Sequence, residues 1–488
     1  KNAGTGDDST AQLFLQTAES DIQADDVLGK INFQAPNEGT GTDAILVAAA
    51  IQAKSEGDFS SSSNATSLEF MTGASEAATV KFAIASDGSL STPTAGTSNV
   101  RFGVNAGNSI ASGGNYNVVL GDEAGTAITT GDQNVFVGSA AGDAVTVGGD
   151  NVGVGRTALT SDTQGSRSVA IGTGTLQTQN HTSATNVNNI AIGYQAGGAI
   201  TTGQHNVLIG SLAGDAMTDA ANCVAIGLSA LTTNTRGNKV VAVGVGAARN
   251  FNYSSGNSDM NSVYVGHNAG EQVTVGGNNV IIGTEACANA AGITGGADLT
   301  TGNNHVVIGK DAAVSAADAD AQVVLGFECV GASNTSLTFG KSATDSNIDF
   351  GATSITAPSD ERYKENIETS TAGLGFINDL RPVTYKWKKA KDIPSDHRAY
   401  IEEGKDGAED RVMERGDDLY HGFIAQEIKV ALDKHSEVKN YKELWREDDD
   451  GRQRVGPAFL IPMLVKSIQE LSAKNDALEA RIKKLEDG

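Results

Sequence analysis

The stretch Asn117-Val-Val-Leu-Gly121 returns as Asn134-Val-Phe-Val-Gly138 and as Asn151-Val-Gly-Val-Gly155. Further copies stand at 189–193, 206–210 and 279–283. The closing glycine falls at positions 103, 121, 138, 155, 172, 193, 210, 227, 244, 266, 283, 309, 326 and 340, and eight of the thirteen intervals are 17 residues. A fixed period of this kind indicates a solenoid in which each repeat forms one coil.

The residue types within the motif suit a short β-strand followed by a corner. The apolar residues one and three places before the glycine share one face of the strand because side chains alternate, and we expect them to point inward. The glycine permits a positive φ at the corner, and an alanine three residues later fits a narrow interior. Stacked asparagines can form ladders. Residues 99–344 are therefore predicted to form a parallel β-solenoid of about 14 coils.

The charged residues divide the chain near residue 358. Residues 1–358 contain 12 Lys and Arg and 31 Asp and Glu, whereas the 130 residues of 359–488 contain 23 and 28. Both tryptophans, Trp387 and Trp445, lie in the second part. We expect a charge-poor body, a linker over 345–358 and a compact charged domain over 359–488.

The first 98 residues lack the repeat but contain strand-like pieces. These are Gly29–Phe33, Ser67–Phe70 and Ala78–Phe82, separated by serine-rich loops and a turn at Asp87-Gly88. The apolar stretch Ala44–Ala53 fits a short helix or a buried strand, and its periodicity does not decide between them. We predict a β-rich N-terminal module over 1–98.

The central repeat resembles the left-handed parallel β-roll of trimeric autotransporter adhesin heads, and similar repeats in phage tail fibres. The 17-residue period departs from the shorter period of those heads. The resemblance implies three parallel chains around a shared axis. Trimerisation is also physically reasonable, because one thin coil with only 5% aromatic residues would bury little surface alone.

Three blocks of the charged part carry a second resemblance. They are Ala357-Pro-Ser-Asp-Glu-Arg-Tyr-Lys-Glu-Asn-Ile367, His421-Gly-Phe-Ile-Ala-Gln-Glu427 and Phe459–Glu470. In this order and spacing they closely resemble the C-terminal intramolecular chaperone of phage endosialidases and other tail spikes, which is a self-cleaving peptidase. Tyr363 stands where a leucine is common. The fold class expected for the whole chain is mainly β: a trimeric left-handed parallel β-roll shaft followed by an α+β chaperone domain that ends in a coiled-coil helix.

The resemblance to the chaperone implies an autocatalytic serine endopeptidase that acts once, on its own chain. Ser359 would be the nucleophile, Lys364 the base and Pro358–Ser359 the scissile bond, with Asp360 and Arg362 in supporting roles. A serine hydroxyl needs a nearby base. A lysine acts as that base only where burial or a positive neighbour such as Arg362 depresses its pKa, which would couple cleavage to folding.

The C-terminal residues 460–486 are predicted to form a coiled coil. Ile at a with Leu at d favours a dimer, and Asn475 at an a position specifies register. This conflicts with a trimer, which we nevertheless expect because both resemblances imply it. The a and d positions are Ile461, Leu464, Ile468, Leu471, Asn475, Leu478, Ile482 and Leu485.

Composition argues against several other classes of protein. The net charge of −24 disfavours nucleic-acid binding, and no apolar run is long enough to insert into a membrane. No signal peptide is visible, and a start at Lys1 is expected of a fragment or a processed product. The scattered histidines match no metal-ligand spacing, so neither a metal nor a cofactor is expected.

Three smaller features have ordinary structural interpretations. Glycine pairs such as Gly153 and Gly155 belong to the repeat and lack the βαβ context of a dinucleotide loop. Cys223, Cys287 and Cys329 lie in or beside repeat motifs and are interpreted as small buried residues. The acidic run 447–451 lacks the ligand pattern of a calcium loop and is interpreted as a solvated loop.

The leading hypothesis is a trimeric phage tail fibre or tail spike, made in the host cytoplasm and carried on the virion. Its partners would be a bacterial surface receptor, either glycan or protein, and other virion tail proteins. One alternative is a tail spike that degrades surface polysaccharide, but residues 1–358 contain no tryptophan for a sugar platform. Another is a bacterial trimeric adhesin head, which would need a C-terminal membrane anchor.

Overall fold

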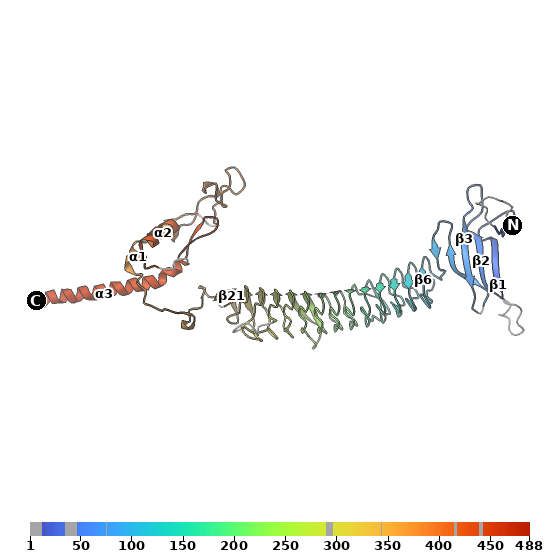
Figure 1. Cartoon of the computed structure of the whole chain (residues 1–488), viewed down its shortest axis with the longest axis horizontal. Coiled ribbons are helices and arrows are strands. Elements are labelled where there is room, and N and C mark those ends of the chain that lie inside the picture. The colour runs from blue at the N-terminus through green and yellow to red at the C-terminus, as the bar shows by residue number, and fades with distance from the viewer. Residues whose placement is uncertain are drawn as a thin grey trace. The chain divides into compact units, whose positions relative to one another are not determined.

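The computed structural model describes residues 12–34, 46–74, 76–288, 296–342, 344–413, 417–438 and 443–488. The chain divides into two compact units, Lys1–Pro358 and Ser359–Gly488. The first unit contains an N-terminal sheet and a β-solenoid, and the second contains most of the helical residues (Figure 1).

The solenoid is a fifteen-stranded sheet in which each repeat adds one strand (Figure 1). All described neighbours in this sheet pair in parallel except β21 and β22, which pair antiparallel. A two-stranded side sheet joins β10 (Gly165–Ser166) to β12 (Thr185–Asn186). The strands of the main sheet are β6 (Val100–Phe102), β7 (Val118–Leu120), β8 (Val135–Val137), β9 (Val152–Val154), β11 (Val169–Ile171), β13 (Ile190–Ile192), β14 (Val207–Ile209), β15 (Val224–Ile226), β16 (Gly237–Val243), β17 (Ser258–Val265), β18 (Val280–Ile282), β19 (Val306–Ile308), β20 (Gln322–Leu325), β21 (Ser336–Lys341) and β22 (Thr344–Asp349).

Equivalent repeat positions stack directly on one another. Val118 pairs with Val135, and Val135 pairs with Val152, with no shift in register. Each position of the motif therefore forms a column along the solenoid. Because neighbouring strands lie about 4.8 Å apart, every side chain in a column contacts its equivalents in the coils on both sides.

The inward-facing residue of each strand differs from the sequence prediction. Val119, two places before the glycine, is completely buried, whereas Val118 and Leu120 are only half-buried. The prediction that residues one and three places before the glycine point inward is therefore wrong. All three positions are apolar, so no polar face marked the outside. The alanines three residues after the glycine, such as Ala124 and Ala141, are buried as expected.

At one place inside the solenoid, the aromatic ring of one coil lies next to a glycine of the following coil. Phe136 is completely buried, and the equivalent position of the next coil is Gly153. A Cβ atom at Gly153 would lie 2.9 Å from Cδ1 of Phe136, which is too close for a side chain. The ring of Phe136 thus occupies space that a side chain at position 153 would need.

The glycine that ends each strand is required for two reasons. Gly138 has φ +133°, a conformation that residues with a side chain rarely adopt. A Cβ atom there would also lie 2.6 Å from the carbonyl oxygen of Gly155 in the next coil. The corner can therefore stack at the strand spacing only if the residue lacks a side chain.

The motif asparagines form a buried ladder that connects successive coils. Asn134 is completely buried, and its Nδ2 donates to the carbonyl oxygen of Gly148 at 2.9 Å. Its Oδ1 accepts from the backbone nitrogen of Asn151 at 3.1 Å. Asn117 makes the same two bonds to Gly131 and Asn134. The expected asparagine ladder is therefore present, and it satisfies backbone groups that water cannot reach.

Some repeats have a different residue at the asparagine position and still bond to the asparagine of the coil before. The backbone nitrogen of Cys223 donates to Oδ1 of Asn206 at 2.9 Å. His305 does the same to Asn279 at 3.0 Å. All three cysteines are buried and free, which confirms their interpretation as small core residues. Burial raises the pKa of the Cys223 thiol to about 11, so it stays protonated and unreactive near neutral pH.

The N-terminal module is an antiparallel sheet of five strands in sequential order (Figure 1). The ambiguous apolar stretch 44–53 contributes a strand, although Ala44 and Ile45 lie outside the described residues. The sheet contains β1 (Val27–Gln34), β2 (Val47–Ser55), β3 (Thr66–Thr72), β4 (Thr79–Ile84) and β5 (Leu90–Ser91).

The second unit is a small α+β domain with its own core. Phe376, Ile428, Leu432 and Leu444 are buried together with Met463 of the last helix. The domain also contains two antiparallel strand pairs, β23 with β24 and the hairpin of β25 with β26. In chain order the elements are η3 (Glu361–Tyr363), α1 (Leu374–Asn378), β23 (Val383–Tyr385), η4 (Ala390–Asp392), β24 (Tyr420–Gly422), α2 (Ala425–Lys434), β25 (Trp445–Glu447), β26 (Gln453–Val455), η6 (Pro457–Leu460) and α3 (Ile461–Glu486).

Helix α3 packs on its own domain over its first turns only. Met463 and Ser467 are buried, and Glu470 accepts a hydrogen bond from the backbone nitrogen of Leu374 at 3.0 Å. Beyond Glu470 the side chains are exposed.

No helix in the described part of the chain is both long and apolar enough to cross a membrane. The exposed apolar residues of α3 are Ile461, Leu464, Val465, Ile468, Leu471, Leu478, Ile482 and Leu485.

The ladder makes a direct prediction about stability. Asn134→Ala should lower the thermal unfolding midpoint, because it leaves the backbone nitrogen of Asn151 and the oxygen of Gly148 buried without these partners. Each such group costs about 1–3 kcal/mol. The control, Asn108→Ala, alters an exposed asparagine of the same solenoid. Calorimetry should find the midpoint of the control unchanged; equal midpoints for both variants would show that the ladder does not stabilise the solenoid.

Candidate active site

A tight turn brings Ser359 and Lys364 together. The backbone nitrogen of Tyr363 donates to the carbonyl oxygen of Asp360 at 3.1 Å, and that of Lys364 donates to Glu361 at 3.0 Å. This 3₁₀ turn, η3, reverses the chain within five residues. As a result, Nζ of Lys364 donates to Oγ of Ser359 at 2.7 Å.

Asp360 caps the turn and also binds the arginine within it. Its Oδ1 accepts from the backbone nitrogen of Arg362 at 2.8 Å, which is the hydrogen bond of a helix N-cap. The guanidinium of Arg362 binds the same carboxylate through Nε at 3.0 Å and Nη2 at 2.6 Å. These bonds to Arg362 lower the pKa of the Asp360 carboxyl group. Asp360 is therefore ionised near neutral pH and holds the first part of the turn through the backbone and side chain of Arg362.

The pairing of Arg362 bears on the two roles expected for it. From the sequence, Arg362 is either a positive neighbour of Lys364 or a structural support of the segment. Its charge is instead compensated by Asp360, with which it forms a two-point ion pair. The side chain of Arg362 therefore helps to fix the shape of the turn.

Ser359 and Lys364 are both exposed in the single chain. In the observed bond the ammonium group donates and the hydroxyl accepts. The reverse transfer, in which lysine takes the hydroxyl proton, requires a neutral amine. The 2.7 Å distance between Nζ and Oγ suits a proton transfer between the two groups.

Residues 359–437 match the family model described as chaperone of endosialidase, which is a peptidase family. The chain carries a chaperone-of-endosialidase domain. The match begins at Ser359, the first residue of the second compact unit. This family implies an intramolecular chaperone that cleaves its own chain, and together with the β-solenoid it fits a tail-spike-like protein. No curated protein and no solved structure matches the chain.

The two downstream blocks of the chaperone domain contribute to its core. The block 421–427 ends β24 and starts α2, and Ile428, the residue directly after it, is buried. Phe423 and Phe459 pack against the same core, which also includes Leu460. The resemblance therefore rests on residues that build the domain, while the candidate dyad lies on the turn at its start.

One histidine of the chaperone domain connects two helix ends. His435, which follows α2, contacts Oδ2 of Asp379 at 3.1 Å and Oε1 of Glu437 at 2.7 Å. The ring also makes an edge contact with the buried Phe376. Hydrogen bonds to Glu437 and then to Asp379 raise the pKa of His435. The sequence does not single out this residue, because Asp379 is 56 positions away and only the fold brings it to the ring.

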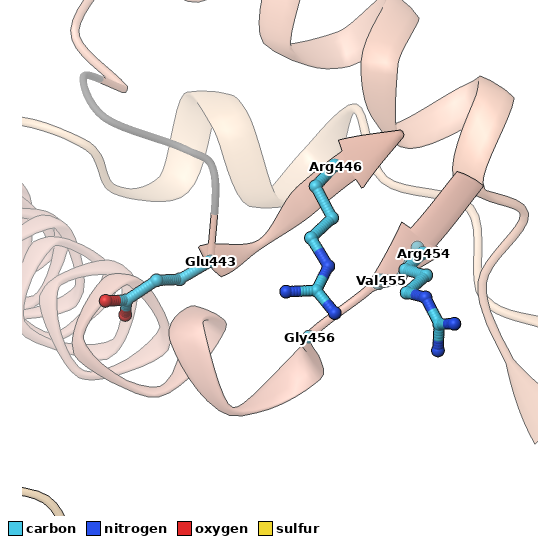
Figure 2. Close-up of a pocket in the computed structure, with 5 residues that line it drawn as sticks. All are labelled: Glu443, Arg446, Arg454, Val455 and Gly456. Carbon is cyan, nitrogen blue, oxygen red and sulfur yellow. The ribbon is translucent and has the colours of Figure 1, made fainter. Parts of the chain in front are cut away.

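The hairpin β25–β26 borders a pocket of about 600 Å³ that contains neither Ser359 nor Lys364. Figure 2 shows Arg446 on one strand of the hairpin and Arg454 on the other, where the two residues lie directly opposite each other.

Asp448 of the acidic run accepts a hydrogen bond from Arg454 at 2.7 Å and forms an ion pair with Arg452 at 3.2 Å. The acidic run interpreted as a solvated loop is therefore partly engaged in ion pairs. Within the described ranges no three His, Cys, Asp or Glu residues gather as a metal site.

We predict that Asp360→Ala slows self-cleavage about fivefold, because loss of an N-cap costs about 1 kcal/mol and frees the turn that sets the distance between Ser359 and Lys364. The rate at which fragments appear on a denaturing gel measures the effect. Asp360→Asn keeps a capping oxygen and should retain most of the rate. An unchanged rate in Asp360→Ala would contradict a positioning role for this cap.

We also predict that stability of the chaperone domain depends on pH through His435. Its folded pKa is raised above the unfolded value, so the stabilisation is complete below about pH 6.5 and is lost as pH rises through the folded pKa. Calorimetry from about pH 6 to pH 8 should show the unfolding midpoint of the domain falling. His435→Asn should flatten this dependence; parallel curves for the two proteins would refute it.

Proposed function

We propose that the protein is a homotrimeric phage tail fibre or tail spike that attaches to a bacterial surface receptor. Its chaperone domain assembles the trimer and then cleaves the bond Pro358–Ser359 through Ser359 and Lys364. One observation carries the catalytic part: Nζ of Lys364 lies 2.7 Å from Oγ of Ser359 at the first residue of the matched domain. The fibre would be made in the host cytoplasm and join other tail proteins of the virion.

The chemistry follows from these two side chains. Neutral Lys364 accepts the hydroxyl proton of Ser359, and Oγ attacks the carbonyl carbon of Pro358. The C–N bond breaks as the amine of Ser359 takes up the proton, which leaves an ester between Pro358 and the serine side chain. Water hydrolyses the ester. The products are a carboxylate on Pro358 and a free amino terminus on Ser359.

Exposure of the dyad explains how cleavage would await assembly. In one chain Lys364 is solvated and its ammonium group donates to the serine. Packing of neighbouring copies around the turn would remove that water and favour the neutral amine. Cleavage would then occur only after the trimer has formed.

The outer columns of the solenoid support association of several copies. These are the residues one and three places before each repeat glycine, such as Val118 and Leu120, and they run from β6 to β21 without a polar interruption. Several members are more than a third exposed, including Ile171, Ile192 and Ile308. An apolar face of this length on an isolated chain indicates a protein interface.

The exposed residues of α3 repeat at coiled-coil spacing and offer a second contact between copies. Their pattern alone favours two helices, whereas the resemblance of the solenoid to adhesin heads implies three chains. We propose three, because a short helix follows the symmetry of the larger body to which it is joined.

Expression of wild type beside Ser359→Ala and Lys364→Met tests the proposal. Wild type should yield two fragments, the smaller beginning at Ser359 by N-terminal sequencing, and both variants should remain whole. Ser354→Ala and Lys386→Ala are matched controls and should cleave normally. Wild type that stays whole after native trimers form, or Ser359→Ala that still cleaves, would refute the dyad; light scattering that finds single chains would refute the trimer.

A further inference from the structure

The N-terminal sheet has its polar and apolar faces in the reverse of the usual arrangement. On β3, Ser67 and Glu69 are 6% and 5% exposed, whereas their neighbours Leu68 and Phe70 are 40% and 37% exposed. Alternating side chains point to opposite faces. One face of the sheet therefore covers polar residues, and the other presents apolar residues to solvent.

The polar face is closed by contacts within the chain itself. Nε2 of Gln52 donates to Oε2 of Glu69 at 2.6 Å, and Nζ of Lys54 lies 3.4 Å from Oε1 of Glu69. Lys54 also binds Asp25 at 2.9 Å. Because these buried groups are partnered, the polar face needs no further protein to cover it.

The apolar face continues across the sheet in rows of paired residues. Ile31 pairs with Ile51, Ile51 with Phe70, and Phe70 with Phe82. A second row joins Leu68 through Ile84 to Leu90, which is 56% exposed. These rows contain no charged residue, although the chain as a whole carries −24.

This face is continuous with the outer columns of the solenoid. The ring of Phe82 lies 6.4 Å from that of Phe102, which is 51% exposed. Phe102 stands one place before the first repeat glycine and pairs with Leu120 in the next coil. Ring contacts thus connect the sheet rows to the column that the proposed trimer would bury.

We infer that the N-terminal apolar face (Ile31, Phe33, Leu68, Phe70, Leu90 and Phe102) packs against the same face of neighbouring copies of this chain. The inference rests on the proposed trimer. Copies joined along the outer columns would bring these faces together, since the Phe82–Phe102 contact links them within each chain. Like-charge repulsion between acidic copies is least where they share an uncharged surface. The sheet would then be part of the trimer and not a free receptor-binding surface.

Cysteine cross-linking on the full chain tests this contact. Ile31→Cys places a thiol on the apolar face, and Asn32→Cys places one on the opposite face of the same strand, where the side chain is also exposed. Ile192→Cys reports on the outer column of the solenoid. The three native cysteines are at most 1% exposed and should not react with a short bis-maleimide under native conditions.

We expect the bis-maleimide to shift most of Ile31→Cys and Ile192→Cys to twice the chain mass on a denaturing gel, and to leave Asn32→Cys at the single-chain mass. Gel filtration of each variant beside wild type checks that it assembles. If Ile192→Cys cross-links while Ile31→Cys reacts with a monofunctional maleimide and stays single, the inference is wrong and the trimer stands. If all three variants elute as single chains, the proposed trimer fails.

Discussion

Direct stacking of equivalent residues at the spacing of β-strands is the constraint on which this protein depends. It requires the corner of every coil to approach the next corner with no side chain between them, as Gly138 approaches Gly155. It also places the asparagines one above another, so that Asn134 can satisfy backbone groups of the following coil. Glycine makes the stacking possible, and asparagine makes it stable in a dry interior.

The same constraint explains why one chain leaves apolar surface uncovered. Of the three residues in each short strand, only the middle one lies fully inside the coil, as Val119 does between the half-buried Val118 and Leu120. The flanking valines, isoleucines and leucines have to face outward. Their columns continue onto the N-terminal sheet through Phe102 and Phe82. In our proposal these columns pack against those of neighbouring copies, which have the same spacing.

The candidate active site is built by a different principle, because it needs only a short segment. Asp360 caps one turn, and that turn sets the 2.7 Å contact between Lys364 and Ser359. Local geometry therefore supplies the distance between the two groups. It does not supply a dry environment, which a short exposed turn cannot create alone. In our proposal, assembly of the copies contributes that environment.

The sequence by itself determined the solenoid, its repeat positions, the asparagine ladder and the start of the chaperone domain at Ser359, because these depend on spacing and on short motifs. It brought Ser359 and Lys364 together as a hypothesis through a resemblance, since serine and lysine five residues apart are otherwise common. Only the tertiary structure decided which face of each strand is inside, because valine and isoleucine occupy both faces and periodicity marks no outside. It also decided that Arg362 belongs to Asp360, that His435 joins two helix ends and that Leu68 and Phe70 face solvent. Those facts depend on side-chain conformation, on which strand face is covered and, for the His435–Asp379 contact, on residues far apart in sequence.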